Sequence, residues 1–366
     1  MAESIRMIMH RRAFILSFVG LLLMTQLIAQ EDRGYKIFQF PPDKIPRIDG
    51  KTDDWTEFPD EYIVGTDQLW DDSGKYPEPD PQNLDVKVRV AWVKGLNRLY
   101  FLYDAYDDYW DFTHPGLHND IFEIVVDGDL SGGPLIDEQH PLQSLDWSAR
   151  YFEFHGVHAQ NYHIFTPAVG KEWALAWGSQ PWIRELPYAN IAYSYDFQPG
   201  ESGKLIAEFW ITPFDYAGRE GPERAVASVL RDHKKIGLTW AVIDYDDVDD
   251  ISKKGFWNLS KHHKMYGNSS LGTIFTLMPL DEKYQKSFEA DWSFMIVDPS
   301  ERMVAFRDQS RGEIFSWYWD FGDGITSNQQ NPVHRYQQAG KYIVVLTIEG
   351  PEGTSRLANV WDVAVE

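Results

Sequence analysis

The chain has 366 residues, no cysteine and a formal net charge of −22. This charge argues against nucleic acid or an anionic membrane as the partner. The lack of cysteine excludes disulfides, thiol chemistry and attachment through a lipid-modified cysteine. The length is sufficient for two domains, each with a core of its own.

The first thirty residues have the pattern of a secretory signal peptide. Arg6, Arg11 and Arg12 form a basic start, and residues 13–29 are almost entirely apolar. We therefore expect an exported protein, in the periplasm, at the cell surface or outside the cell, with no membrane span after cleavage. An uncleaved anchor helix is the alternative, although this run is at the lower length limit for crossing a bilayer.

Strand patterns dominate the remainder of the chain. Apolar and polar residues alternate over 84–92 and again over 99–105, on either side of a short turn, which predicts a β-hairpin. Further strands are predicted at 121–127, 150–155, 204–211, 236–243 and 272–277, and a short helix at 223–233. Trp92 and Trp240 lie on the apolar faces of these strands and are expected in the core. The pattern predicts an all-β protein with an antiparallel β-sandwich over residues 31–280.

A change in composition near residue 280 predicts a linker over 281–289 and a second, smaller domain over 290–366. This segment contains Trp319-Asp320-Phe321-Gly322-Asp323-Gly324, followed by Asn331-Pro332 and Gly340-Lys341-Tyr342. These motifs closely resemble the PKD domain, an Ig-like β-sandwich that mostly acts as a spacer or as a module that contacts proteins or polysaccharides. Asp320 and Asp323 can accept bonds from backbone N–H groups in the turn, and the two glycines permit positive φ. We therefore interpret this loop as a self-stabilised turn rather than a metal site.

The large domain resembles a family 9 carbohydrate-binding module, which has a DOMON-like sandwich. The resemblance covers residues 37–278 and rests on several motifs in order: Ile48-Asp49-Gly50 to Trp55, the hairpin at 84–106, His118-Asn119-Asp120 to Asp127-Gly128-Asp129, and Gly272-Thr273-Ile274-Phe275. It implies a non-catalytic protein that binds a poly- or oligosaccharide between two aromatic rings, beside enzymes of polysaccharide degradation, with calcium bracing its loops. Longer inserts at 128–147 and 156–200 depart from the family.

Two loops hold the aromatic residues that suit the apolar C–H faces of a pyranose ring. Trp110 and Trp257 are the predicted sugar-stacking pair. The other candidate ligand-binding residues are Tyr109, Phe112, Asn258 and Tyr266. The competing interpretation is that these tryptophans pack beneath the loops.

Two acidic clusters offer the hard oxygen ligands that calcium prefers. They supply the four predicted metal ligands, Asp127, Asp129, Asp244 and Asp246. Neither cluster has EF-hand spacing. The resemblance implies a structural calcium that braces the loops.

Three other classes of function remain open. A glycoside hydrolase or lyase would need paired carboxylates, for which Glu123 and Asp127 are candidates, but both lie on one face of one short strand. Haem binding would need axial ligands, and the histidines at 155, 158 and 163 read better as surface residues than as such a set. A structural or protein-interaction role for a surface protein is the main alternative, and it predicts no saturable sugar affinity.

Overall fold

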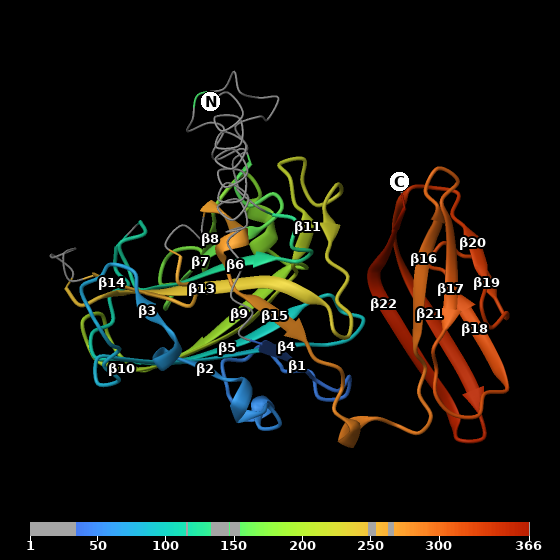
Figure 1. Cartoon of the computed structure of the whole chain (residues 1–366), viewed down its shortest axis with the longest axis horizontal. Helices are drawn as coiled ribbons and strands as arrows, with labels where there is room; N and C mark the ends of the chain where they lie inside the picture. The colour runs from blue at the N-terminus through green and yellow to red at the C-terminus, as the bar shows by residue number, and fades with distance from the viewer. Residues whose placement is uncertain are drawn as a thin grey trace, which may run out of the picture.

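The computed structural model describes residues 34–114, 116–132, 146, 154–247, 254–262 and 267–365. The predicted signal peptide lies outside these ranges. Within them, no helix is long and apolar enough to cross a membrane. Strands and short 3-10 helices form two domains that lie side by side (Figure 1).

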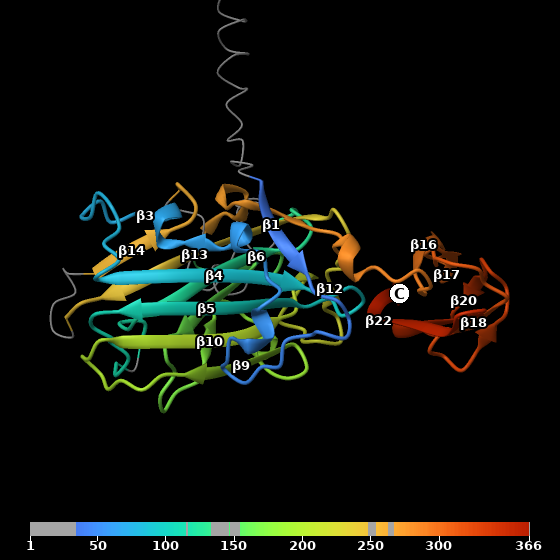
Figure 2. The same cartoon turned by 90° about the horizontal axis from the view of Figure 1, so that it is seen from below.

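The large domain is a sandwich of two antiparallel layers. The first layer has the order β8-β7-β6-β13-β15; β14 also pairs with β13, and β3 pairs with β14. It comprises β3 (Trp70–Asp71), β6 (Ile121–Asp127), β7 (Gln160–Phe165), β8 (Ala174–Ala176), β13 (Lys235–Tyr245), β14 (Lys254–Asn258) and β15 (Ile274–Leu277). The second layer, seen face-on in Figure 2, comprises β2 (Val64–Gly65), β4 (Leu84–Trp92), β5 (Leu99–Asp107), β9 (Ala189–Ser194) and β10 (Gly203–Ile211). The fold class predicted from the sequence is confirmed.

Strand β1 (Tyr35–Gln39) joins the two layers. Residues 35–37 pair with β15, and residues 38–39 pair with β4, in both cases in parallel. One strand therefore changes layer, which closes one side of the sandwich. Between the layers, alternate residues of the strands form one core that includes Trp92 and Trp240, both fully buried as predicted.

The segment between β1 and β2 covers the outer face of the second layer. The Glu208 carboxylate accepts the backbone N–H groups of Asp49 (2.9 Å) and Gly50 (3.1 Å) and the Trp55 indole N–H (2.9 Å). Gly50 has φ +77°, and a Cβ at this position would lie 2.9 Å from the backbone of Tyr193. This close approach explains the glycine of the Ile48–Trp55 motif.

One helix prediction and one strand prediction need correction. Residues 223–233 are not helical; they contain β12 (Val226–Ala227), which pairs with β11 (Phe214–Tyr216). Of the strand predicted at 150–155, only residues 154 and 155 are described, and they are not extended. The 3-10 helices are η1 (Asp53–Trp55), η2 (Asp60–Tyr62), η3 (Thr66–Gln68), η4 (Pro181–Arg184), η7 (Ser269–Leu271) and η8 (Glu282–Tyr284).

The C-terminal domain is a smaller sandwich with its own core. One sheet has the order β16-β17-β20 and the other β19-β18-β21-β22, comprising β16 (Trp292–Asp298), β17 (Met303–Asp308), β18 (Ser316–Asp320), β19 (Thr326–Ser327), β20 (Val333–Arg335), β21 (Gly340–Gly350) and β22 (Gly353–Val365). Trp319 is fully buried, and Trp317 packs against the same core. The predicted turn is confirmed, because Asp320 accepts from Gly322 N and Asp323 from Ile325 N, each at 3.0 Å.

The domains meet where the β4–β5 turn of the large domain contacts β22. Gly95 O accepts the N–H of Val360 (3.0 Å), and the Asn97 side chain donates to Val360 O (3.2 Å) and to the Asp362 carboxylate. Because β22 is an edge strand, this turn satisfies backbone groups that the edge would otherwise leave open.

Candidate metal centre

Three carboxylates converge at one end of the large sandwich. Asp107 ends β5, Asp120 precedes β6 and Asp244 lies near the end of β13. Each offers a carboxylate oxygen within 4.8 Å of the other two, and all three side chains are buried. We call Asp107, Asp120 and Asp244 the carboxylate cluster.

The strand pattern places these side chains together. Ala105, Phe122 and Val242 belong to the core between the layers. Each cluster residue lies two positions from one of them towards the same end of the sandwich, after it in β5 and β13 and before it in β6. Since side chains alternate across a strand, all three carboxylates point inward. Ile121 pairs with Ile243, so Asp120 and Asp244 are direct neighbours, and Asp107 reaches them from the other layer.

Neighbouring groups hold the cluster in place. The Asp120 carboxylate accepts the N–H groups of Asp111 (2.6 Å) and Tyr245 (2.8 Å), and Asn83 Nδ2 donates to Asp244 Oδ2 at 3.1 Å. Asp244 Oδ1 is buried and has no hydrogen-bond partner among the described residues. A second group of Asp107, Asp108 and Asp246 extends the acidic surface towards solvent.

Burial and mutual repulsion raise the pKa of these carboxyls. The pKa values of Asp107 and Asp120 are raised well above the usual range, first by burial and then by the adjacent carboxylates. Burial, with repulsion from Asp246 and Asp108, raises the pKa of Asp244 to about 8. A divalent cation would replace the protons and remove this repulsion. Oxygen-only ligands of this kind fit calcium.

The structure separates the four acidic residues that the sequence nominates as metal ligands. Asp244 and Asp246 belong to the acidic groups just described. Asp127 and Asp129 lie at the opposite end of β6. The Asp127 carboxylate accepts from Gly132 N (2.9 Å) and Ser269 Oγ (3.0 Å), and Asp129 accepts from Ser131 N (3.1 Å) and Ser131 Oγ (2.6 Å). The bonds from Gly132 and Ser131 are those of a self-stabilised turn, and the bond from Ser269 ties that turn to η7.

The predicted stacking tryptophans are buried. Trp110 is 1% exposed, its ring lies parallel to that of Phe197 at 5.0 Å, and its indole N–H donates to Gly203 O. Trp257 is 4% exposed and lies 5.9 Å from the ring of Tyr76. In this structure neither ring offers an open face to a sugar, because each completes the core beneath its loop.

The other four candidate ligand-binding residues differ in their exposure. Phe112 is buried, and Asn258, also buried, accepts from Ser260 N at 2.9 Å. Tyr109 is half-exposed, and Tyr266 lies outside the described residues. A second exposed aromatic residue that the sequence did not indicate, Tyr195, is 39% exposed and lies 6.3 Å from Phe112.

Most of the residues considered for catalysis or for haem binding are buried. Glu123 accepts from Asn161 (3.0 Å) and lies 3.4 Å from His163. Contrary to the prediction of surface histidines, His155 is fully buried and His163 nearly so, and burial lowers the pKa of His155 to about 4. Only His158 of the three is exposed.

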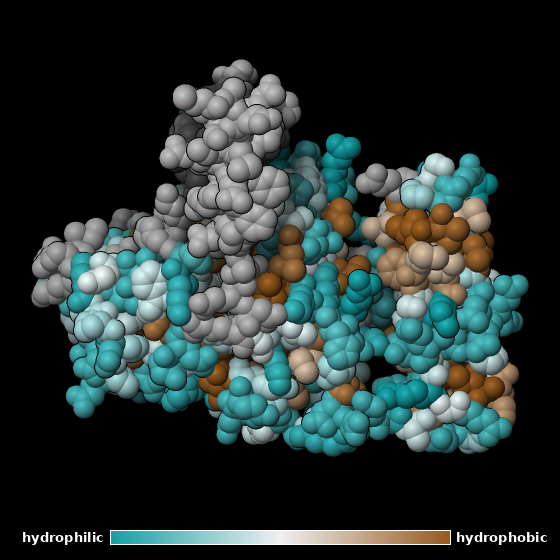
Figure 3. Space-filling view, viewed as in Figure 1, coloured by the Kyte–Doolittle hydropathy of each residue, from teal (hydrophilic) through white to brown (hydrophobic). Residues whose placement is uncertain are grey.

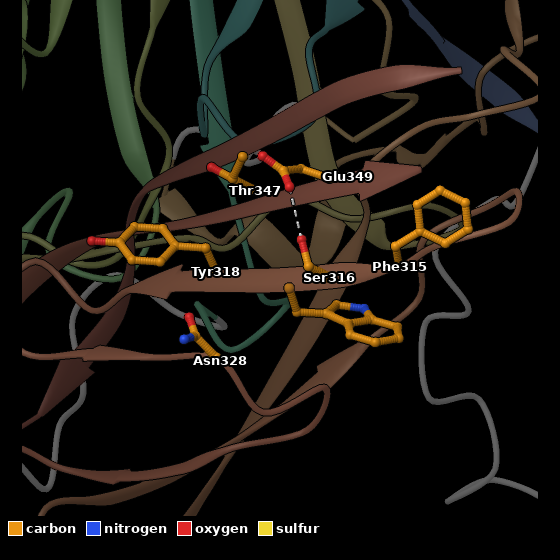
Figure 4. Close-up of a pocket in the computed structure, with 7 residues that line it drawn as sticks. Phe315, Ser316, Tyr318, Asn328, Thr347 and Glu349 are labelled. Carbon is orange, nitrogen blue, oxygen red and sulfur yellow. Dashed lines mark hydrogen bonds between the residues drawn. The ribbon is translucent and has the colours of Figure 1, made fainter. Parts of the chain in front are cut away.

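The C-terminal domain carries a shallow pocket of about 580 Å³ on the face of β18 and β21. Figure 4 shows Phe315 and Tyr318 with polar side chains between them, where Ser316 Oγ donates to Glu349 at 3.1 Å. Phe315 is 65% and Tyr318 49% exposed.

Comparison with known proteins supports the assignment of the C-terminal domain. Residues 297–365 match the family model of the PKD domain, as the sequence predicts. Collagenase ColQ1 of Bacillus cereus is 50% identical over 42 residues, which are 12% of this chain and 4% of that protein, and collagenase ColA of Clostridium perfringens is 30% identical over 125 residues, 30% of this chain and 11% of that protein. The chain therefore spans only a small part of these relatives.

Two solved structures are similar to one domain each. A family 9 carbohydrate-binding module from Caldicellulosiruptor kristjanssonii in complex with cellotriose has a TM-score of 0.42 and 12% identity, covering 69% of this chain and 97% of its own. The PKD1 domain of Vibrio cholerae metalloprotease PrtV has a TM-score of 0.18 and 30% identity, covering 20% of this chain and 91% of its own. Similarity at this level says nothing about a ligand.

Proposed function

We propose that this is an exported, non-catalytic carbohydrate-binding protein whose binding loops are braced by calcium, and that it acts beside enzymes that degrade polysaccharides. The observation that carries the proposal is the carboxylate cluster. It lies where the loop after β5 meets the end of β13, and that loop presents an aromatic side chain to solvent.

The sugar contacts proposed here are Tyr109 and Tyr195. The backbones of their two loops are joined by Trp110 N to Glu201 O (3.1 Å) and Gly200 N to Trp110 O (2.8 Å). Trp110, Phe112 and Phe197 form a buried aromatic support under these loops. The two tyrosines can therefore be held as partly exposed rings, which suits stacking on a pyranose.

Calcium would be held by Asp107, Asp120 and Asp244, with Asp246 and Asp108 at the solvent side. Because Asp120 also accepts the N–H of Asp111, filling the cluster would fix the loop that carries Tyr109. Sugar affinity should then depend on calcium, although the ion lies beneath the sugar and does not contact it.

The test is calorimetric titration of the protein with a panel of plant, algal and host oligosaccharides, with calcium or with a chelator. We expect saturable binding that weakens about tenfold or more in Tyr109→Ala or Tyr195→Ala, as the loss of one stacking ring predicts. Tyr106→Ala, a 37% exposed tyrosine on the face of β5, is the matched control. Loss in Tyr318→Ala instead would place the sugar in the pocket of the C-terminal domain.

A protein-interaction role is the alternative, and one surface favours it. Met295, Ala305 and Val333 form a row across the outer face of β16, β17 and β20, with Met295 65% and Val333 56% exposed. Figure 3 shows apolar residues gathered on this domain. If the folded protein binds no glycan in the panel, the carbohydrate proposal is wrong and this surface becomes the leading candidate.

A further inference from the structure

The loop between β5 and β6 brings one carboxylate and two imidazoles together. Asp111, His114 and His118 each offer a ligand atom, and these three atoms lie within 4.8 Å of one another. The two imidazole rings lie parallel, with centroids 4.5 Å apart, and the ring of Tyr245 lies 4.4 Å from that of His118. We call Asp111, His114 and His118 the histidine site.

Each side chain of this site has a polar atom without a partner in the part of the chain that the structure describes. Asp111 Oδ2, His114 Nε2 and His118 Nε2 are all buried and accept or donate no hydrogen bond there. Asp111 itself is only 2% exposed. Buried polar atoms without partners are costly, so three of them on neighbouring side chains indicate a bound group.

The loop is built to hold this arrangement. The fully buried Asn119 accepts from His114 N (3.1 Å) and donates to the backbone oxygens of His114 (3.1 Å) and Gly116. Lys171 Nζ donates to His114 O (2.7 Å) and Asn119 Oδ1 (2.9 Å). The backbone around both histidines is therefore fixed before any ligand binds.

We propose that the histidine site binds Zn²⁺. Two imidazole nitrogens and one carboxylate oxygen are a common ligand set for zinc, with bonds of about 2.0–2.2 Å and ligand atoms about 3.3 Å apart. The lone pair of an imidazole nitrogen lies in the plane of its ring, so one of the two stacked rings must turn out of the stack for both to bind the same ion. Three protein ligands leave a fourth tetrahedral position for water or an external donor.

The ligand chemistry distinguishes this site from the carboxylate cluster beside it. The cluster offers oxygens alone, which favour calcium, whereas imidazole favours zinc and its neighbours among the transition metals. Asp120 joins the two sites, because its carboxylate belongs to the cluster and accepts the backbone N–H of Asp111. One short loop thus carries ligands for two different ions.

The experiment uses the purified protein, with any affinity tag removed, treated with chelator and then kept in millimolar calcium so that the carboxylate cluster is filled. Co²⁺ is titrated as a spectroscopic probe and is then displaced with Zn²⁺. We expect one equivalent of Co²⁺ with the intense visible bands of tetrahedral coordination, and their loss on addition of one equivalent of Zn²⁺.

Three variants make the result specific. His114→Ala and His118→Ala should each weaken Zn²⁺ binding by at least about tenfold, and near-UV circular dichroism will report whether each variant is folded. His158→Gln, at an exposed histidine near the opposite end of the sheet, should bind like the parent. His118→Gln serves if His118→Ala does not fold.

The proposal is overturned if the parent gives no tetrahedral Co²⁺ spectrum. It is also overturned if the bands persist unchanged in the folded His114 and His118 variants, or if they disappear in His158→Gln. None of these outcomes bears on sugar binding, which the tyrosine variants test separately.

Discussion

The position of Asp244 along β13 determines its burial and its pKa. It lies one inward-facing step beyond Val242, so it is buried against two other carboxyls instead of reaching solvent. Its pKa is raised to about 8. Between its ordinary pKa of about 3.9 and about 8, the folded protein retains a proton that the unfolded chain has released.

This difference sets the pH dependence of stability. In chelator, the free energy of unfolding should fall by about 2 kcal/mol or more as the pH rises from about 5 to about 8, because the folded state binds more protons than the unfolded state over this window. Calcium binds the deprotonated carboxylates, so calcium should reverse the fall, by about 2.7 kcal/mol at a concentration one hundred times Kd. Urea unfolding across this pH range measures both effects.

Asp244→Asn supplies the matched variant. It should reduce the slope of the pH profile in chelator, because only Asp107 and Asp120 then carry raised pKa values, and it should abolish the stabilisation by calcium. Asp129→Asn is the control, because Asp129 lies at the other end of β6 in a self-stabilised turn and should leave both unchanged. A calcium response that survives Asp244→Asn but disappears in Asp129→Asn would move the ion to the other end of the sheet.

At the scale of single elements, the turn between β18 and β19 contains two glycines that have similar backbone angles but different surroundings. Gly322 has φ +79° and Gly324 φ +88°. A Cβ on Gly322 would lie 2.5 Å from Ile343 O, whereas a Cβ on Gly324 would meet nothing within 4 Å. Only Gly322 is therefore required for close packing as well as for its φ.

We expect Gly324→Ala to destabilise the C-terminal domain by about 1–2 kcal/mol, the cost of a left-handed conformation. Gly322→Ala should cost clearly more, because the methyl group also displaces β21. Hydrogen exchange of peptides from β18 and β21, followed by mass spectrometry, measures the difference in the intact protein. Equal effects of the two substitutions would show that the contact with Ile343 is unimportant.

For the whole molecule, one buried residue supplies two of the hydrogen bonds at the junction between the domains. Asn97 is 1% exposed and has φ +52°. Its Oδ1 accepts from Leu230 N (2.9 Å) within the large domain, while its Nδ2 donates to Val360 O and Asp362. The same side chain therefore orders the β4–β5 turn and binds it to β22.

Asn97→Gly keeps the positive φ without strain and removes all three bonds. It should leave buried groups of Leu230 and Asp362 unpaired, at a cost of about 1–3 kcal/mol to docking. Small-angle X-ray scattering should detect a larger radius of gyration, and calorimetry a wider separation of the two unfolding transitions. Lys94 lies in the same turn and forms a partly exposed ion pair with Asp291. Lys94→Ala removes this pair and should change the free energy of docking by about 1 kcal/mol at most. Unchanged scattering from Asn97→Gly would mean that other contacts fix the domains.

Local patterns in the sequence are sufficient to predict the two-sandwich architecture. Period-two alternation places Leu84–Trp92 and its partner strand in a hairpin, because the pattern is local and one face must be buried. The turn around Gly322 and Gly324 was equally predictable, since its bonds join residues two apart. The acidic run that contains Asp244 and Asp246 is sufficient to predict both as metal ligands.

Which of these residues act together depends on how the strands pair and how the layers pack. Asp120 lies beside Asp244 because β6 pairs with β13, and Asp107 lies beside both because the other layer ends at the same place. Separations of 13 and 124 residues conceal this proximity. A period-two count carried one step beyond the last inward-facing residue of β5 and β13, and one step before the first of β6, would have indicated all three. Trp110 and Trp257 could not be assigned in this way, because an aromatic residue at the end of a sandwich can cover the core or face a ligand. Only the position of Phe197 and Tyr76 beside their rings settles that choice.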